Sequence, residues 1–271
     1  MSSKLLAGKK GIITGALDEN SIAWKTAVKA HEHGAKIVLT NAPIAMRMGK
    51  INALAEQLSS KIIPADATNS DDINKLLSES QEFLGGKIDF VLHSIAQSPN
   101  IRKGVPYAEL NYEYYDKTLD ISALSLHKIL NAAYKMDAMS EWGSVVALSY
   151  IAAQRTFSFY TDMADAKALL ESIVRSFGYH YGKYRKVRVN SVSQSPTKTT
   201  AGGGIKGFDT FFDFAELNSP LGNASADSCA EYCITLFSDL TRMVTMQNLY
   251  HDGGYSYTGA SAEIMNKFSG E

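Results

Sequence analysis

Residues 11–23 read GIITGALDENSIA and supply the first strand, turn and helix expected in this chain. The apolar run GIIT predicts a strand, and Gly15 directly after it lets the backbone turn tightly and approach a ligand. Ser21 is a good capping residue, so we predict a helix that begins near it and whose first amides attract a pyrophosphate. Two glycines of the G-x-G-x-x-G fingerprint are missing, however, and Asp18 and Glu19 stand nearby. The stretch fits an ordinary capped helix as well as it fits a nucleotide site.

Short apolar runs and longer segments with helical periodicity alternate along the rest of the chain. Strands are predicted at residues 11–14, 36–40, 61–64, 88–94, 144–149, 187–193 and 247–254, and helices at 21–34, 50–58, 70–84, 113–140, 160–182 and 225–238. Strands that alternate with helices pair in parallel through crossover helices. We therefore predict an α/β fold, a single doubly wound, Rossmann-type domain over residues 1–271 with a central parallel sheet flanked by helices on both faces. Its ligands should bind at the carboxyl ends of the strands.

The composition excludes several classes of protein. The 271 residues are 45% hydrophobic and 20% charged with a net charge of −1, so neither disorder nor a basic surface for nucleic acid is expected. We also expect no signal peptide and no membrane span, and hence a cytoplasmic protein. Cys229 and Cys233 lie four apart in a helical pattern, which is typical of small core residues. No metal site is predicted, because no His or Cys pair accompanies them.

Two further strand ends carry residues that suit a nucleotide. Asp66 follows the third strand, where a carboxylate can accept a hydrogen bond from an adenine amino group. Ser94, Ile95 and Ala96 follow the fourth strand and His93, and they are small enough to let a cofactor lie against the backbone. Either segment alone could be a plain turn, but together at successive strand ends they favour a nucleotide site.

Residues 160–167 read YTDMADAK and place a tyrosine seven residues before a lysine in a predicted helix. Seven residues are close to two turns, so Tyr160 and Lys167 should share a face and lie roughly 10 Å apart along the axis. That separation suits a ligand lying across both side chains. An ordinary amphipathic helix would explain the octapeptide equally well. Tyr150 lies ten residues before Tyr160, at the end of the fifth predicted strand.

In this region the chain resembles the short-chain dehydrogenase/reductase superfamily, and within it the bacterial enoyl-acyl-carrier-protein reductases. The superfamily usually has Tyr-x-x-x-Lys preceded by a serine, but here Met163 stands four before Lys167 and Ala147 thirteen before Tyr160. Tyr-x6-Lys with a second tyrosine ten residues upstream is the pattern of the enoyl reductases. The resemblance runs from about residue 8 to 257 and includes HSIA at 93–96, LSY at 148–150, RVNSVS at 188–193, SPTKTTA at 195–201, SPLGN at 219–223 and HDGG at 251–254.

The resemblance implies reduction of the carbon–carbon double bond of trans-2-enoyl-acyl-carrier-protein thioesters by NADH, in the last step of the fatty acid elongation cycle. Hydride attack at the β carbon leaves an enolate, whose charge gathers on the thioester oxygen. A tyrosine hydroxyl with a pKa of about 10 can donate to that oxygen at neutral pH, and we assign Tyr160 to this role. Tyr150 can share or replace it. Lys167 would hold the nicotinamide ribose and place positive charge near the enolate.

The resemblance also implies the binding residues. The expected cofactor-binding residues are Gly15, Ser21, Ile22, Asp66, Ala67, Ser94, Ile95, Ala96, Lys167, Thr197, Lys198, Thr199, Thr200 and Ala201. The expected substrate-binding residues are Ser98, Tyr150, Tyr160 and Met163.

The end of the second predicted strand favours NADH over NADPH. An adenosine 2′-phosphate needs a cation close to this position. Asn41, Ala42 and Pro43 offer none, and the first basic residue is Arg47. NADH-binding members of the family more usually have a glutamine where Ala42 stands, so the preference need not be strict.

A mobile substrate lid is expected at about residues 197–218. Gly202, Gly203 and Gly204 form a flexible stretch before four phenylalanines that can close over an acyl chain, namely Phe208, Phe211, Phe212 and Phe214. A surface helix packed by its aromatic residues is the alternative. The acyl carrier protein is acidic, so Arg102 and Lys206 are candidate docking charges.

The resemblance further implies a homotetramer, with Tyr179, Tyr181 and Tyr184 as candidates for a subunit-facing surface. Two other functions stay open. The first is another superfamily reaction such as reduction of a 3-oxoacyl thioester, which the missing serine and the altered spacing disfavour. The second is a non-catalytic nucleotide sensor, which the presence of all three catalytic candidates disfavours.

Overall fold

The computed structural model describes residues 4–47, 50–200, 202–204 and 207–269. Its strands are β1 (Lys10–Thr14), β2 (Lys36–Thr40), β3 (Lys61–Ile62), β4 (Ile88–His93), β5 (Met139–Ser149), β6 (Arg188–Gln194) and β7 (Asn248–His251). The α-helices are α1 (Ile22–Glu32), α2 (Pro43–Met46), α3 (Ile51–Gln57), α4 (Ser70–Leu84), α5 (Pro99–Lys103), α6 (Tyr112–Leu119), α7 (Ser125–Lys135), α8 (Thr161–Arg185), α9 (Phe208–Asn218), α10 (Ala226–Phe237) and α11 (Ala262–Ser269). These elements confirm the predicted α/β class.

The strands form one sheet in the order β3-β2-β1-β4-β5-β6-β7, and every neighbouring pair is parallel. The chain winds from β1 outward to β3, then crosses back to β4 and winds outward the other way. The switch in strand order therefore lies between β1 and β4, where a doubly wound sheet opens a crevice for ligands.

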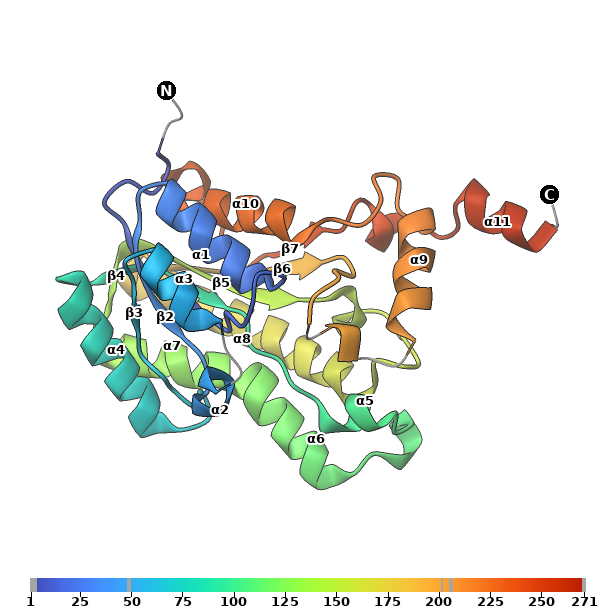
Figure 1. The fold of residues 1–271 in the computed structure, drawn as a ribbon, viewed down its shortest axis with the longest axis horizontal. Helices are drawn as coiled ribbons and strands as arrows, with labels where there is room; N and C mark the ends of the chain where they lie inside the picture. Colours follow the sequence, from blue (N-terminus) through green and yellow to red (C-terminus); the bar gives the residue numbers. More distant parts are fainter. Residues whose placement is uncertain (1–3, 48–49, 201, 205–206, 270–271) are drawn as a thin grey trace.

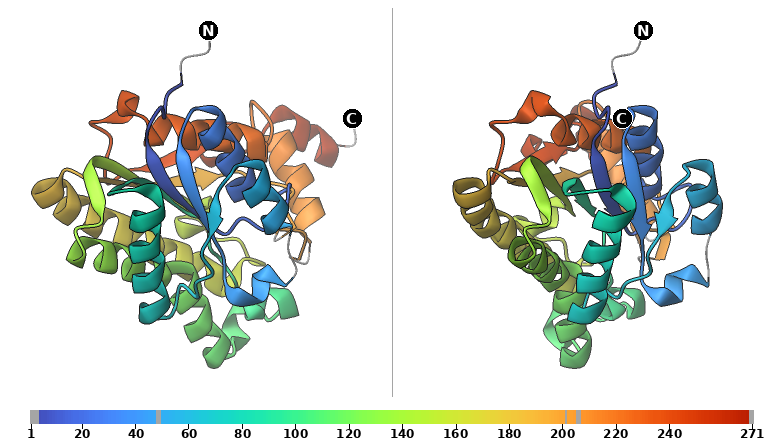
Figure 2. Two further views of the ribbon diagram at one scale, coloured as in Figure 1. Left: turned by 60° about the vertical axis from the view of Figure 1, so that its left-hand side comes forward. Right: turned by 90° about the vertical axis from the view of Figure 1, so that its left-hand side faces the viewer.

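Helices cover both faces of the sheet, as Figures 1 and 2 show. On one face α1, α3 and α10 pack on β1, β2, β4 and β5 through a core that includes Trp24, Leu54 and Phe237. On the other face α4, α7 and α8 build a second core that includes Leu77 and Leu170. The apolar strand runs are buried on both sides, which is why they read as nearly continuous apolar segments.

The cysteine pair lies where its spacing predicted. Cys229 and Cys233 are both fully buried in the core beneath α10, and neither forms a disulfide. Within the described residues, no group of three or more His, Cys, Asp or Glu is arranged to hold a metal ion. In the same part of the chain, no helix combines the length and the apolar character that crossing a membrane requires.

The single helix predicted at 113–140 is wrong. The structure has α6, then a π-helical turn at Asp120–Leu124, then α7, which ends at Lys135. The last residues of the predicted helix instead begin β5, because Met139 pairs with Ile88 of β4 and the amide of Ile88 donates to the carbonyl of Ala138. Pairing with a strand about fifty residues earlier thus overrides the local helical pattern.

Tyr181 was wrongly grouped with surface residues. It is 1% exposed and packs in the core against Tyr134, with ring centroids 5.2 Å apart. Tyr179 and Tyr184 are exposed as predicted. Tyr179 and Tyr181 are two residues apart and so lie on nearly opposite sides of α8. Tyr184 follows Tyr181 by a little less than one turn and is displaced around the helix axis. Tyr181 therefore faces the sheet, while Tyr179 and Tyr184 face outward.

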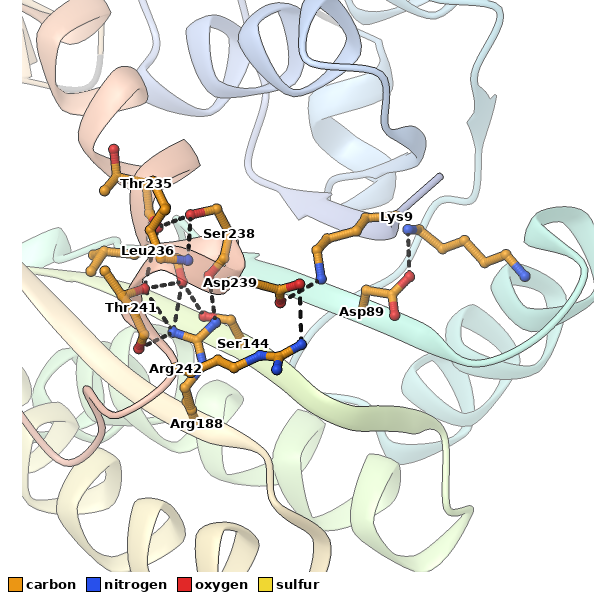
Figure 3. A network of polar contacts seen from close by, with 12 residues as sticks. Lys9, Asp89, Ser144, Arg188, Thr235, Leu236, Ser238, Asp239, Thr241 and Arg242 are labelled. Carbon is orange, nitrogen blue, oxygen red and sulfur yellow. Dashed lines mark hydrogen bonds and ion pairs between the residues drawn. The ribbon is translucent and has the colours of Figure 1, made fainter. Parts of the chain in front are cut away.

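A polar network lies near the amino ends of the strands, on the side of the sheet opposite the crevice (Figure 3). Buried Arg188, at the start of β6, donates to the carbonyls of Leu236 and Thr241 at 2.9 Å and of Ser238 at 3.2 Å. Ser144 of β5 donates to the same Leu236 carbonyl at 2.8 Å. These bonds satisfy carbonyls at the carboxyl end of α10 and tie that helix to two strands, which assigns Arg188 to structure rather than to the site.

Candidate functional site

The carboxyl ends of β1 and β4 are in direct contact at the switch point. Gly15 has φ +82°, and a Cβ added to it would lie 2.0 Å from the carbonyl oxygen of Ser94. The Thr14 hydroxyl donates to the Leu92 carbonyl at 2.9 Å and accepts from the Ser94 amide at 3.0 Å. Glycine at position 15 is therefore required by both the backbone angle and the close approach. The bridging hydroxyl of Thr14 was not predicted, because serine and threonine carry no positional signal within a strand.

The helix after this turn begins as predicted. Ser21 is the N-cap of α1, and its Oγ accepts from the Trp24 amide at 3.2 Å. Ile22 is the first helical residue and packs against the core. Asn41, at the end of β2, donates to the Ala16 carbonyl at 3.0 Å, so the ends of β1 and β2 are held together. The crevice floor thus consists of a glycine turn and the amino end of a helix.

Two other predicted cofactor residues line the same edge. Asp66 is exposed, and its Oδ1 accepts from the amide and hydroxyl of Thr68 at 2.9 and 2.7 Å, which fixes the orientation of the carboxylate. Ala67 is partly buried against the core. Ile95 is half-buried and Ala96 exposed immediately after β4. These positions agree with a ligand lying along the strand ends, and the assignment of each residue to it stays a prediction.

Tyr150 and Tyr160 lie side by side at the end of β5. Their ring centroids are 4.9 Å apart, and both belong to one apolar cluster with Phe157 and Tyr255, in which the Tyr150 ring lies 5.7 Å from that of Phe157. Burial raises the pKa of the Tyr150 hydroxyl well above its usual value, and it likewise raises the pKa of Tyr160. Both hydroxyls therefore keep their protons at neutral pH and can donate a hydrogen bond. The Tyr150 hydroxyl is buried without a partner among the described residues.

Lys167 is buried on the strand-facing side of α8. Its Nζ donates to the Leu148 carbonyl at 2.7 Å, two residues before Tyr150. Burial lowers the pKa of Lys167 to about 8, against the opposing effect of the Glu171 carboxylate. The lysine thus brings a positive charge to the strand end that carries Tyr150, in a low-dielectric setting where that charge acts strongly.

The helical geometry assumed for Tyr160 needs correction. α8 begins at Thr161, and Tyr160 is its N-cap residue rather than part of a regular turn. Thr161 has φ +31°, so the backbone is distorted where the tyrosine leaves the helix. Tyr160 and Lys167 are therefore not separated by two regular helical turns. Tyr160 reaches the site because the chain turns at the amino end of α8.

A buried carboxylate that was not predicted from the sequence binds the segments around the amino end of α8. Asp162 is fully buried and accepts four hydrogen bonds: from Ser98 Oγ at 2.6 Å, Asn100 Nδ2 at 2.8 Å, Thr118 Oγ1 at 2.9 Å and Thr161 Oγ1 at 3.2 Å. The donors come from α5, α6 and the start of α8, and the carboxylate also sits at the favourable end of the helix dipole. An aspartate near a helix start reads as a routine surface residue in sequence, so no local signal reveals this network.

Two predicted substrate residues lie around this carboxylate. Ser98 is 4% exposed and caps α5 while it donates to Asp162, so its hydroxyl is already engaged. Met163 is 5% exposed and packs with Ile101 and Tyr160. Contact of either side chain with a substrate stays a prediction.

Replacing Asp162 by asparagine should lower the free energy of unfolding by about 1–3 kcal/mol, because an amide keeps one acceptor where the carboxylate had two. Asp165→Asn is the matched control on the same helix. Asp165 is only partly buried and accepts from the hydroxyls of Tyr107 and Tyr115 at 3.1 and 3.2 Å, so its loss should cost less than about 1 kcal/mol. Denaturant unfolding of both variants measures the two losses in free energy of unfolding. Equal losses would contradict the larger contribution to stability assigned to Asp162.

The loop after β6 carries the remaining predicted cofactor residues. Thr197 donates to the carbonyl of Ser195 at 3.0 Å, and Thr199 accepts from the Gly202 amide at 3.0 Å. Thr200 donates to Asp18 at 2.5 Å, so this loop reaches across to the turn after β1. Lys198 lies over the ring of Phe212. Ala201, also predicted here, lies outside the described residues, as does Lys206.

The four phenylalanines of α9 divide into two groups instead of forming one surface. Phe211 packs on Phe159 and Phe157, with ring centroids 4.9 and 5.3 Å away, and Phe214 lies near Tyr255. Phe208 and Phe212 pair with each other on another side of the helix, 6.1 Å apart. Of the four, Phe211 lies against the tyrosine pair, with its ring centroid 6.3 Å from that of Tyr150. Helical spacing separates the two groups, but it does not say which of them faces the site.

The site as a whole fits a dinucleotide. The glycine turn has no room for a side chain, and the amino end of α1 lies next to it. Backbone can approach a pyrophosphate at such a turn, while the helix end favours its charge. Two protonated tyrosines and a buried lysine lie at the neighbouring strand end. This set can polarise a carbonyl oxygen next to a reacting carbon, which suits reduction of a conjugated double bond.

Comparisons with known proteins agree with this chemistry. Residues 15–256 match the family model described as Enoyl-(Acyl carrier protein) reductase. The NADH-type enoyl-[acyl-carrier-protein] reductase FabI of Rickettsia typhi is 33% identical over 264 residues, which cover 96% of this chain and 99% of that protein.

Solved structures give the same result. The FabI–NADH complex of Alistipes finegoldii is 61% identical, with a TM-score of 0.95 and coverage of 97% of this chain and 93% of that one. The Bacillus cereus enoyl-acyl carrier protein reductase, solved with NADP+ and indole naphthyridinone, is 30% identical, with a TM-score of 0.87 and coverage of 94% and 99%.

Proposed function

The chain belongs to the enoyl-(acyl carrier protein) reductase family, whose NADH-type members reduce enoyl thioesters in fatty acid biosynthesis, and we propose that Tyr150, Tyr160 and Lys167 perform that reaction here. The cofactor is NADH and the substrate is an enoyl chain carried by acyl carrier protein. The observation that supports the assignment of residues is the tyrosine pair, with ring centroids 4.9 Å apart, at the strand end where buried Lys167 binds the Leu148 carbonyl.

Each residue acts at a stated atom. NADH, when bound, would supply a hydride for the β carbon of the enoyl thioester. The Tyr160 hydroxyl donates to the thioester oxygen as charge develops there, and the Tyr150 hydroxyl lies close enough to share that donation. Lys167 would hold the ribose hydroxyls of the nicotinamide half of NADH, and its charge would stabilise the enolate. The packed aromatic rings exclude water, so these interactions act in a medium of low dielectric constant.

The end of β2 supports a preference for NADH. Ala42 precedes α2 and carries no polar side chain, and Arg47 is exposed at the end of that short helix. Lys50 is paired with Glu19, with 3.2 Å between Nζ and Oε2. The residue that follows Asn41 at the end of β2 is thus uncharged, and the first basic residues after it along the chain are Arg47 and Lys50. The relative from Bacillus cereus was solved with NADP+, so we propose a preference rather than strict exclusion.

We assign the substrate lid to α9 and the loop before it. Phe211 covers the tyrosine pair, and its ring lies 6.3 Å from that of Tyr150, so displacement of α9 would open a path for an acyl chain. Arg102, exposed at the end of α5, remains a candidate docking charge for acyl carrier protein. A homotetramer built partly through Tyr179 and Tyr184 of α8, and a cytoplasmic location, also stay predictions.

The function is tested by measuring NADH oxidation with a trans-2-enoyl thioester and, in parallel, with a 3-oxoacyl thioester. We expect turnover of the enoyl thioester and a KM for NADH well below that for NADPH. Turnover of the 3-oxoacyl thioester alone would favour the other superfamily reaction. NADH binding without turnover of either substrate would favour a nucleotide sensor.

A further inference from the structure

A buried carboxylate holds both ends of the segment that carries Tyr150. Glu171 of α8 is 4% exposed. Its Oε1 accepts from Ser149 Oγ at 2.7 Å, and its Oε2 accepts from Gln154 Nε2 at 2.9 Å. Ser149 is the last residue of β5, and Gln154 follows the short helical turn Ile151–Ala153. One side chain therefore binds the residue just before Tyr150 and another four residues after it.

Lys167 adds a third attachment from the same helix. It lies one turn before Glu171, and its Nζ binds the carbonyl of Leu148, the neighbour of Ser149. Gln154 is in turn held by the Tyr250 hydroxyl of β7, at 2.6 Å from its Oε1. Tyr150 itself has no hydrogen-bond partner among the described residues, so its position depends on these contacts of its flanking residues and on the rings packed around it.

The same carboxylate acts on the charge of the lysine. Burial lowers the pKa of Lys167, and the negative charge of Glu171 opposes this effect. His93 of β4 also faces the lysine, but burial lowers its pKa to about 3, so it is neutral at physiological pH. The Tyr250 hydroxyl, which faces Glu171 across Gln154, has its pKa raised by burial and is neutral as well. Among the described groups that shift the Lys167 pKa, Glu171 therefore supplies the countercharge.

We propose that Glu171 is a positioning residue for the reductase reaction, whose carboxylate fixes the Tyr150 segment against α8 and supplies the countercharge of Lys167. This inference rests on the roles proposed above for Tyr150 and Lys167. Both functions need a carboxylate: two acceptor oxygens are used by two donors on either side of Tyr150, and a neutral amide offers only one acceptor and no charge.

The test compares Glu171→Gln with Asp165→Asn, which removes the same charge from the same helix. Asp165 lies two positions from Lys167, on another side of α8, and its hydrogen bonds within the described residues are with Tyr107 and Tyr115. We expect Glu171→Gln to lower kcat for enoyl thioester reduction by about 10- to 100-fold with a smaller change in KM for NADH, as misplacement of a catalytic group does. Asp165→Asn should keep the native kcat.

The pH profile separates positioning from a general loss of structure. Lys167 loses its proton as pH rises, so kcat/KM of the native enzyme should fall as pH rises through about 8. Removing the negative charge of Glu171 lowers the pKa of Lys167 further, so this decline should move to lower pH in Glu171→Gln but not in Asp165→Asn. Ser149→Ala should lower kcat in the native chain, and its effect should not add independently to that of Glu171→Gln, because the two side chains share one hydrogen bond.

Several results would overturn the proposal. One such result is a native kcat and an unchanged pH profile in Glu171→Gln. Another is a lower melting temperature while kcat/KM still falls at the same alkaline pH, since that pattern describes a merely structural residue. Tyr160→Phe and Lys167→Met serve as reference variants. If these two lose activity while Glu171→Gln does not, only the inference about Glu171 fails. If they retain activity, the proposed catalytic roles fail.

Discussion

Tyr160→Phe is expected to lower kcat/KM for enoyl thioester reduction by about 10²–10³-fold, the usual effect of removing one donor to a developing oxyanion. The substitution leaves the ring and its packing in place, including the contact with Tyr150 at 4.9 Å between centroids. The loss should therefore appear mainly in kcat, with the KM for NADH little changed. Steady-state kinetics at saturating NADH measures it directly.

Tyr150→Phe is the comparison that divides the work between the two tyrosines. The Tyr150 hydroxyl is buried without a partner in the described part of the chain, so its removal should leave the free energy of unfolding unchanged or slightly higher. We expect a smaller loss of kcat/KM than for Tyr160→Phe. A larger loss for Tyr150→Phe would reverse the assignment and make Tyr150 the principal donor.

Gly15→Ala is expected to abolish tight NADH binding and to destabilise the fold. The residue has φ +82°, and an added Cβ would lie 2.0 Å from the Ser94 carbonyl oxygen. Left-handed backbone at a non-glycine residue costs roughly 1–2 kcal/mol, and the clash must in addition push β1 and β4 apart at the switch point. We expect the free energy of unfolding to fall by about 2–4 kcal/mol, within the range for a strained backbone position.

Gly85→Ala isolates the backbone contribution. Gly85 also has positive φ, +73°, but an added Cβ there meets no atom within 4 Å. Its substitution should cost about 1–2 kcal/mol, the backbone penalty alone, with NADH binding unchanged. Denaturant unfolding and NADH titration of the two variants provide the test. If the two variants lost the same free energy of unfolding, or if Gly15→Ala bound NADH with native affinity, the close contact between the ends of β1 and β4 would not be the reason for glycine at position 15.

Local sequence chemistry determined the architecture and the location of the site. Apolar runs alternating with helical segments predicted the parallel sheet, since strands buried on both faces must be apolar nearly throughout. Gly15 and the Ser21 cap were predictable because each is required by the conformation of its own backbone. The tyrosine and lysine spacing, through its resemblance to a known family, predicted the chemistry. Each of the residue motifs among these signals lies within about two dozen consecutive residues.

Tertiary structure alone decided how the site is held. The bond between Ser98 and Asp162 joins residues 64 apart, and the Thr14 hydroxyl reaches the Leu92 carbonyl 78 residues on. Ser149 and Glu171 come together because α8 folds back along β5. Periodicity describes which face of an element is apolar, but it does not specify which polar groups from distant elements meet beneath that face. The burial of Asp162, Glu171 and Tyr181 depends on those meetings, so the sequence without the fold could not reveal it.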